Sequence, residues 1–340
     1  MPESPKRRSW FVSLLRDRWV QAALLLWIAG SLAVFPLSRG TLPFDWPGAT
    51  KTAIAAQVIS PVVTVAAFLL LMGLVYFLTR RREIPNLAAR APARAVALRE
   101  LLWLWTYGAG VMAAGQLIGV RLFGAGLGLH LNGSLFGATR VQAPAEVWTW
   151  TIYNFVFFAV LPYIVFRARG YSREALNLKS ANLGNDTLVV VVVLAIMCAL
   201  DLTLGPLLKT GFTGHQILEG GAISFVVHLL GTGLPVMVFI YAIMMPRYMK
   251  LTESVAATTL LGALSYGVVH LLEYWTVYDS PPHSVLSVIF VLLTFVPPGL
   301  VKSYLTLRTG NAWVHLWAFH AISPHVTIDT RLIIRDFSIR

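Results

Sequence analysis

A histidine and a glutamate stand three residues apart in an apolar stretch of the sequence, at His270 and Glu273. In a helix this spacing puts both side chains on one face, where they can share a proton or bind one cation. An ionisable group costs about 2.5–3.5 kcal/mol at the centre of a membrane-spanning helix, so each such group calls for an explanation. The pair is therefore a candidate catalytic and metal-binding site. The alternative puts Glu273 at the membrane surface beside Tyr274 and Trp275, with His270 as a packing residue.

Three further histidines lie close together near the end of the chain, at His315, His320 and His325. Neutral imidazole is a common metal ligand, especially for zinc. On a helix His320 shares a stripe with Trp317, whereas His315 and His325 point elsewhere unless Pro324 ends the helix. We therefore predict His320 as a catalytic or metal-binding residue and Trp317 as a cavity-lining residue. We expect His315 and His325 to be interfacial groups that face headgroups or water.

Two more polar residues interrupt apolar stretches, His228 and Asp201. His228 precedes a segment broken by Gly231 and Pro235, and such breaks occur where backbone lines a cavity or packs on a neighbour. We expect His228 to line a cavity. Asp201 can extend toward the outer surface near Lys209, or pair with a histidine inside. The first half of the chain has almost no such groups, so we expect its first three spans to be scaffold.

The elements that must position these residues are membrane-spanning helices. Hydrophobic residues make up 57% of the 340-residue chain and charged residues 12%, which excludes an ordinary water-soluble domain. A helix needs roughly 20 apolar residues to cross a bilayer. Eight stretches meet this requirement, at 19–37, 53–79, 101–120, 147–166, 186–207, 222–245, 255–277 and 284–306. A ninth, at 311–326, is short. The sequence predicts an all-α polytopic bundle of eight or nine spans.

The basic residues are distributed unevenly between these stretches. There are 27 Lys and Arg against 15 Asp and Glu, but they lie between apolar runs, so we expect a lipid bilayer and no nucleic acid as partner. Nineteen of the 27 fall in alternate connections: Lys6, Arg7, Arg8, Arg16, Arg18, Arg80, Arg81, Arg82, Arg90, Arg94, Arg99, Arg167, Arg169, Arg173, Lys179, Arg247, Lys250, Lys302 and Arg308. This asymmetry predicts a cytoplasmic N-terminus, and we expect a bacterial-type inner membrane. The basic tail would then lie outside, unless the last segment re-enters the membrane or lies on its surface.

Two connections on the opposite side are unusual. Residues 36–52 contain proline and tryptophan and are expected to form an interfacial loop. Residues 119–145 carry six glycines. A phosphate-binding loop needs a strand before it and a helix after it, whereas this segment is flanked by spans. We therefore expect a flexible or close-packed external loop. The single cysteine, Cys198, excludes an internal disulfide.

Tyr266 and His270 form an aromatic-x-x-x-His pattern, and His320 followed by Ala321 resembles the start of a His-x-x-x-Asn pattern. In these residues, and from about 160 to 330, the chain resembles the CPBP family (CAAX-protease and bacteriocin-processing enzymes). The resemblance implies an all-helical intramembrane metalloprotease fold. It divides the chain into a basic N-terminal segment (1–18), a transmembrane scaffold (19–166) and a CPBP-like core with a tail (167–340).

The chain departs from the family at two motifs. The family's Glu-Glu-x-x-x-Arg motif should fall near 235–242, where this sequence has no carboxylate. The residue four places after His320 is Pro324 rather than asparagine. In the family the glutamates help to bind metal or to activate water. Without a carboxylate, a neutral apolar cavity offers no base to take a proton from water.

These observations leave several functions open. The first is a divergent, catalytically silent CPBP-like protein that binds a hydrophobic peptide, lipid or membrane protein. The second is a peptidase-like hydrolase in which Glu273 replaces the lost carboxylate and, with His270 and His320, holds one divalent metal such as zinc. His228, Tyr266 and Trp317 would line its cavity. A transporter with a proton relay is the third, although the sequence shows no inverted repeat. Enzyme status stays open.

Overall fold

The computed structural model describes residues 16–44, 52–124, 127–133, 141, 143–205 and 207–340. These residues form helices and loops, with no strand among them. Seven of the helices are long and apolar enough to cross a membrane: Arg18–Ser38, Ile54–Thr79, Arg94–Phe123, Pro144–Ala168, Leu183–Lys209, Gly214–Thr252 and Pro281–Thr309. A shorter apolar helix covers Val255–Val268. The prediction of an all-α polytopic bundle of about eight spans is confirmed.

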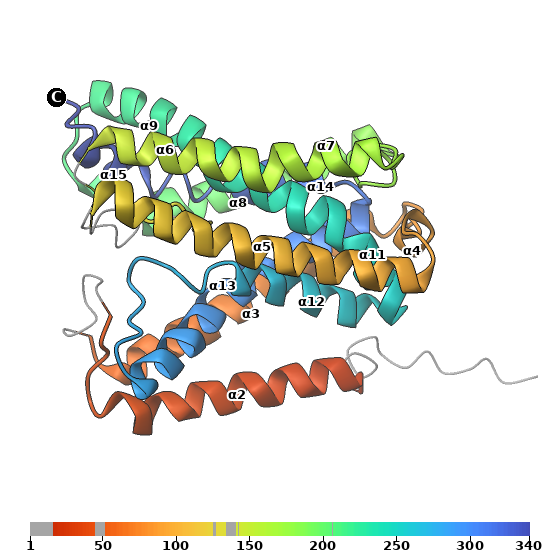
Figure 1. Ribbon diagram of the computed structural model, residues 1–340, viewed down its shortest axis with the longest axis horizontal. Coiled ribbons are helices and arrows are strands. Elements are labelled where there is room, and N and C mark those ends of the chain that lie inside the picture. The colour runs from red at the N-terminus through yellow and green to blue at the C-terminus, as the bar shows by residue number, and fades with distance from the viewer. Residues whose placement is uncertain (1–15, 45–51, 125–126, 134–140, 142, 206) are drawn as a thin grey trace, which may run out of the picture.

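The spans run back and forth along the long axis of the molecule (Figure 1). In chain order the helices are α2 (Arg18–Ser38), α3 (Ile54–Thr79), α4 (Leu87–Arg90), α5 (Arg94–Phe123), α6 (Pro144–Asn154), α7 (Leu161–Ala168), α8 (Leu183–Leu204), α9 (Gly214–His228), α10 (Leu234–Val236), α11 (Met245–Thr252), α12 (Val255–Val268), α13 (Pro281–Thr309), α14 (Ala312–His315) and α15 (Thr330–Asp336). π-helical turns join α6 to α7, join α9 through α10 to α11, and follow α14. Residues 1–15, which hold Lys6, Arg7 and Arg8, and part of the predicted Pro- and Trp-containing loop at 36–52 lie outside the described residues. The first residues of that loop, 36–38, belong to α2.

The last segment runs through the bundle from one end to the other. It begins at Asn311, whose side-chain amide donates to Asp186 at 2.9 Å, and ends at α15, which packs on α9. Figure 1 shows α15 and the C-terminus beside the start of α9 and far from α4 and α11. The segment therefore does not return to the end at which it begins. The basic tail therefore lies at the end away from α4 and α11.

Buried ion pairs join the connections at the α4–α11 end. Glu100 accepts from Arg247 at 2.7 and 2.8 Å and from Arg169 at 2.8 Å. The Tyr171 hydroxyl also donates to Glu100, and burial together with this bond raises the pKa of that hydroxyl. Arg82 pairs with Asp186 at 2.6 Å. The expectation of almost no ionisable groups in the first half concerned the predicted spans, and Arg82 and Glu100 lie just outside the stretches 53–79 and 101–120. Hydropathy therefore gave no sign that these two side chains are buried.

The described part of the glycine-containing connection after α5 lies inside the protein. Leu127, Leu129 and Leu131 are buried, and the Leu129 amide donates to the carbonyl of Gly115 at 3.0 Å. A side chain on Gly119 would lie 2.8 Å from the backbone of Leu127 and Leu129, so only glycine allows this approach. Residues 127–133 are close-packed, which was one of the two expectations, but the predicted external position is wrong for them. We call this segment the interior strap.

Substitution of Gly119 by alanine is expected to destabilise the protein by about 1–3 kcal/mol, because its Cβ would overlap backbone that cannot swing away. Gly110 on the same helix is the matched control, since nothing lies within 4 Å of a Cβ there. Gly110→Ala should be neutral or stabilise by up to about 1 kcal/mol. Unfolding midpoints in detergent measure both changes. Equal midpoints for the two variants would contradict the packing described for the strap.

Substitution of Arg247 by alanine is expected to cost about 3–5 kcal/mol, because it leaves Glu100 buried without its main partner. Arg173→Ala, on an exposed side chain, should change stability by less than about 0.5 kcal/mol. Thermal unfolding in detergent compares the two variants. A small loss for Arg247→Ala, similar to that of the control, would show that this ion pair does not hold the connections together.

Candidate metal centre

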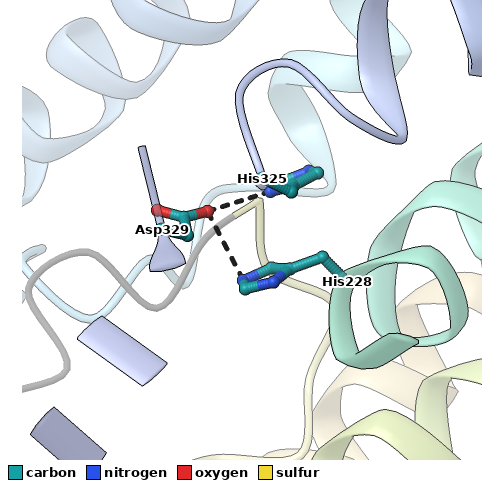
Figure 2. A group of neighbouring side chains, drawn as sticks. All are labelled: His228, His325 and Asp329. Carbon is teal, nitrogen blue, oxygen red and sulfur yellow. Dashed lines mark hydrogen bonds and ion pairs between the residues drawn. The ribbon is translucent and has the colours of Figure 1, made fainter. Parts of the chain in front are cut away.

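Three ligand-type side chains meet where α9 passes the last segment. His228 is the final residue of α9, His325 lies in the turns after α14, and Asp329 precedes α15. Figure 2 shows the two imidazoles and the carboxylate pointing toward one another. Asp329 Oδ2 lies 2.9 Å from His325 Nδ1 and 3.4 Å from His228 Nε2. The imidazole rings stack with centroids 4.5 Å apart and planes 7° from parallel.

The spacing of these atoms suits a metal ion. One ligand atom from each of the three residues lies within 4.8 Å of the others, and all three side chains are buried. Zinc ligands at 2.0–2.2 Å from the ion lie about 3.3–3.6 Å from one another in a tetrahedral site. The distance from Asp329 to His228, 3.4 Å, falls in this range, whereas the distance from Asp329 to His325, 2.9 Å, is that of a direct hydrogen bond and would lengthen slightly around an ion. Two histidines and one carboxylate are also a frequent ligand set of catalytic zinc, which keeps a fourth position open.

Ser224 fixes the orientation of this group. The backbone carbonyl of Ser224 lies 2.9 Å from His228 Nδ1, and because a carbonyl only accepts, Nδ1 carries the proton. His228 Nε2 then presents its lone pair on the side of Asp329. The Ser224 hydroxyl donates to the carbonyl of His325 at 2.6 Å, which ties α9 to the last segment. Such contacts hold a metal-binding imidazole in one tautomer and one direction.

A line of aromatic rings leads away from the group. The ring centroid of His320 lies 5.1 Å from that of His325 and 5.9 Å from that of Tyr266. Both nitrogens of His320 are buried and have no hydrogen-bond partner among the described residues. His315 lies 6.2 Å from His320 and 4.2 Å from Tyr241, again between centroids. The interior of the bundle therefore holds several imidazoles in succession.

The prediction that His315 and His325 face headgroups or water is wrong. Their relative exposures are 0% and 2%. The physical reason is the path of the last segment, which continues beyond its short helix as a series of turns and stays inside the bundle. Asp201 takes part in holding this path. It accepts hydrogen bonds from the hydroxyls of Ser323 and Thr327, so neither of the two expectations for Asp201 describes its contacts.

His270 and Glu273, the predicted pair, are buried rather than interfacial. Helix α12 ends at Val268, so a turn rather than a helical face brings the two together. His270 Nε2 lies 4.0 Å from Glu273 Oε1, and that oxygen accepts from the amide of Gly133, in the interior strap, at 2.9 Å. The Glu273 carboxylate is therefore enclosed by protein.

The structure brings His270 and His320 to the same residue but does not gather the whole predicted set. Both rings contact Tyr266, with centroids 4.4 and 5.9 Å away. Within the described part of the chain, His270 and Glu273 approach to 4.0 Å, but His270, Glu273 and His320 do not form a set of three ligand atoms that all lie within 4.8 Å of one another. Trp317 is half-buried and stacks on Phe225. Catalytic and cavity-lining roles for these residues stay predictions.

Two members of the group were missed in the sequence. Asp329 lies beyond the last apolar stretch, and His325 was assigned to the surface, although the two stand four residues apart as a His–Asp pair. That spacing, typical of side chains one turn apart, is the signal that could have found them. No known protein family, curated protein or solved structure matches the chain.

Proposed function

We propose that this multi-pass membrane protein is a metal-dependent hydrolase whose ion is held inside the bundle by His228, His325 and Asp329. The observation that carries the proposal is the buried Asp329 carboxylate in contact with two imidazoles. Two imidazoles and a carboxylate that converge in a buried position form a frequent ligand set of catalytic zinc. Such a set would leave a fourth position on the ion for water or substrate.

The lack of a carboxylate near 235–242 favoured a silent protein, and Asp329 removes that objection by supplying one from another segment. The resemblance of Tyr266, His270 and His320 to CPBP motifs supports a peptidase-like reaction on a hydrophobic substrate. Bound zinc would polarise a carbonyl and lower the pKa of water. His228 would stay oriented through its bond to Ser224, and His320, with both nitrogens open, is placed to accept a proton. The surrounding apolar side chains would exclude bulk water.

We also propose that the α4–α11 end faces the cytoplasm of a bacterial-type cell. Arg82 and Arg169 lie in connections at this end and Arg247 lies in α11 beside them, and basic residues at the ends of spans favour the cytoplasmic side. The N-terminus would then be cytoplasmic too, since α2 begins at the same end (Figure 1).

A catalytically silent protein that binds a hydrophobic peptide or lipid is the second candidate. The direct contact of Asp329 with His325, at 2.9 Å, favours it, because a protonated histidine would satisfy the carboxylate without a metal. Metal content separates the two candidates.

Purified wild-type protein in detergent is expected to bind one zinc ion per chain, measured by elemental mass spectrometry after dialysis. His325→Ala and Asp329→Ala should weaken zinc binding by at least roughly tenfold, because each removes a ligand atom. His283→Ala is the matched control, since His283 pairs with Asp279 at the same spacing but on the surface. Glu273→Gln should retain the ion, which distinguishes this centre from the set predicted from the sequence. Metal-free wild-type protein would instead support the silent binder.

In proteoliposomes, the zinc-loaded protein is expected to cleave a fluorescence-quenched peptide with a hydrophobic anchor. Asp329→Asn should lower the rate by about 100-fold or more, because metal activation is worth several kcal/mol. A chelator should abolish cleavage and added zinc restore it. Retained cleavage in Asp329→Asn would exclude this centre as the catalytic one.

A further inference from the structure

Lys302 is a buried basic residue whose partner is missing. It lies within α13, with a relative exposure of 2%. Arg82 and Arg247, which are equally buried, each contact a carboxylate at 2.6 to 2.7 Å. Among the described residues no carboxylate lies within 4.0 Å of Lys302 Nζ. Lys302 thus lies inside a helix rather than in the connection predicted from the sequence, because α13 continues to Thr309.

The Lys302 ammonium group lies among aromatic and imidazole rings. Nζ is 3.6 Å from the centroid of the Tyr266 ring. That ring also contacts the imidazoles of His270 and His320, with centroids 4.4 and 5.9 Å away. A cation over an aromatic face is stabilised in part, but the ring supplies no full counter-charge.

His320 adds a second unsatisfied donor to this surrounding. A neutral imidazole carries one N–H, and neither nitrogen of His320 has a hydrogen-bond partner in the described part of the chain. His270 differs, because its Nδ1 bonds to the carbonyl of Tyr266 and so carries the proton. His315 differs too, since its Nδ1 lies 3.5 Å from the hydroxyl of Thr306, which itself donates to the carbonyl of Lys302. Lys302, with no carboxylate within 4.0 Å, and His320, with neither nitrogen bonded in the described part of the chain, are therefore two donors beside Tyr266 that an anion would satisfy.

We propose that Lys302 and His320 bind the anionic group, a carboxylate or phosphate, of an amphiphilic molecule that enters the bundle. Such a group would neutralise the ammonium and accept the imidazole N–H. The ring of His320 lies 5.1 Å from His325, so the bound anion would be next to the proposed metal centre. This inference deepens the proposed function. Anion binding by Lys302 and His320 does not require the metal centre, whereas the idea that the anionic amphiphile is the substrate rests on the proposed hydrolase.

Binding of single-chain amphiphiles to the full-length protein, stripped of metal by a chelator, tests this site. The probes are decyl phosphate, decanoate and uncharged decanol, followed by calorimetric titration in a nonionic detergent. Metal removal matters because either anion could otherwise bind the ion. We expect at least one anionic probe to bind saturably and decanol to bind at least tenfold more weakly. The stronger of the two anions identifies the source as phosphate or carboxylate.

Lys302→Met is expected to weaken the preferred anion at least tenfold, because it keeps the length of the side chain and removes the charge. Lys179→Met, on an exposed lysine, is the matched control and should bind as the wild type does. His320→Phe serves as an independent variant if Lys302→Met does not fold, and it should also weaken binding. Unchanged affinity in the folded variant, or equal affinity for decanol, would overturn the anion site.

The outcome is separable from that of the metal experiment. Zinc content of Lys302→Met should equal that of the wild type, because Lys302 is not among the three proposed ligands. Loss of anion binding with zinc retained supports both sites. Zinc binding in a wild type that shows no preference for anions over decanol overturns the anion site and leaves the metal centre intact.

Discussion

Charge that is removed from water must be neutralised by other groups of the protein, and this constraint shapes the whole molecule. At the α4–α11 end it is met by carboxylates that bind arginines from different connections, as Glu100 does with Arg169 and Arg247. These pairs are costly to break because either partner alone would be left in a low-dielectric interior. They fix the ends of the spans relative to one another, so that an irregular last segment can pass between them.

Buried charge is accommodated differently where α9 meets the last segment. There Asp329 contacts two imidazoles, and Ser224 ties α9 to the segment that carries His325. A site assembled from two segments far apart in sequence depends on their relative position to within a fraction of an ångström. The proposed chemistry therefore depends on packing between α9 and the last segment as much as on the ligands themselves.

The spans were predictable from the sequence because hydropathy records contact with lipid directly. The stretches predicted at 19–37 and 284–306 correspond to Arg18–Ser38 and Pro281–Thr309. The site was predictable only in part. His270 and His320 were recognised as interior groups. The spacing of His270 and Glu273, however, was interpreted on a continuous helix, whereas α12 ends before His270. Asp329 lies outside any apolar stretch, so hydropathy carries no signal that it is buried. Turns, unlike helices, have no period from which facing residues can be read.

The interior strap formed by residues 127–133 has a consequence for biogenesis. Its backbone is not helical and lies against α5, where Gly119 leaves room for it, and the amide of Gly133 donates to Glu273. A segment without helical hydrogen bonds cannot enter lipid alone, since its peptide groups would be unsatisfied there. It must be drawn inward after α5 and α6 have been threaded through the bilayer, and its bond to Glu273 can form only once α12 has been synthesised. The order in which the segments are synthesised thus determines when the interior strap can take its final place.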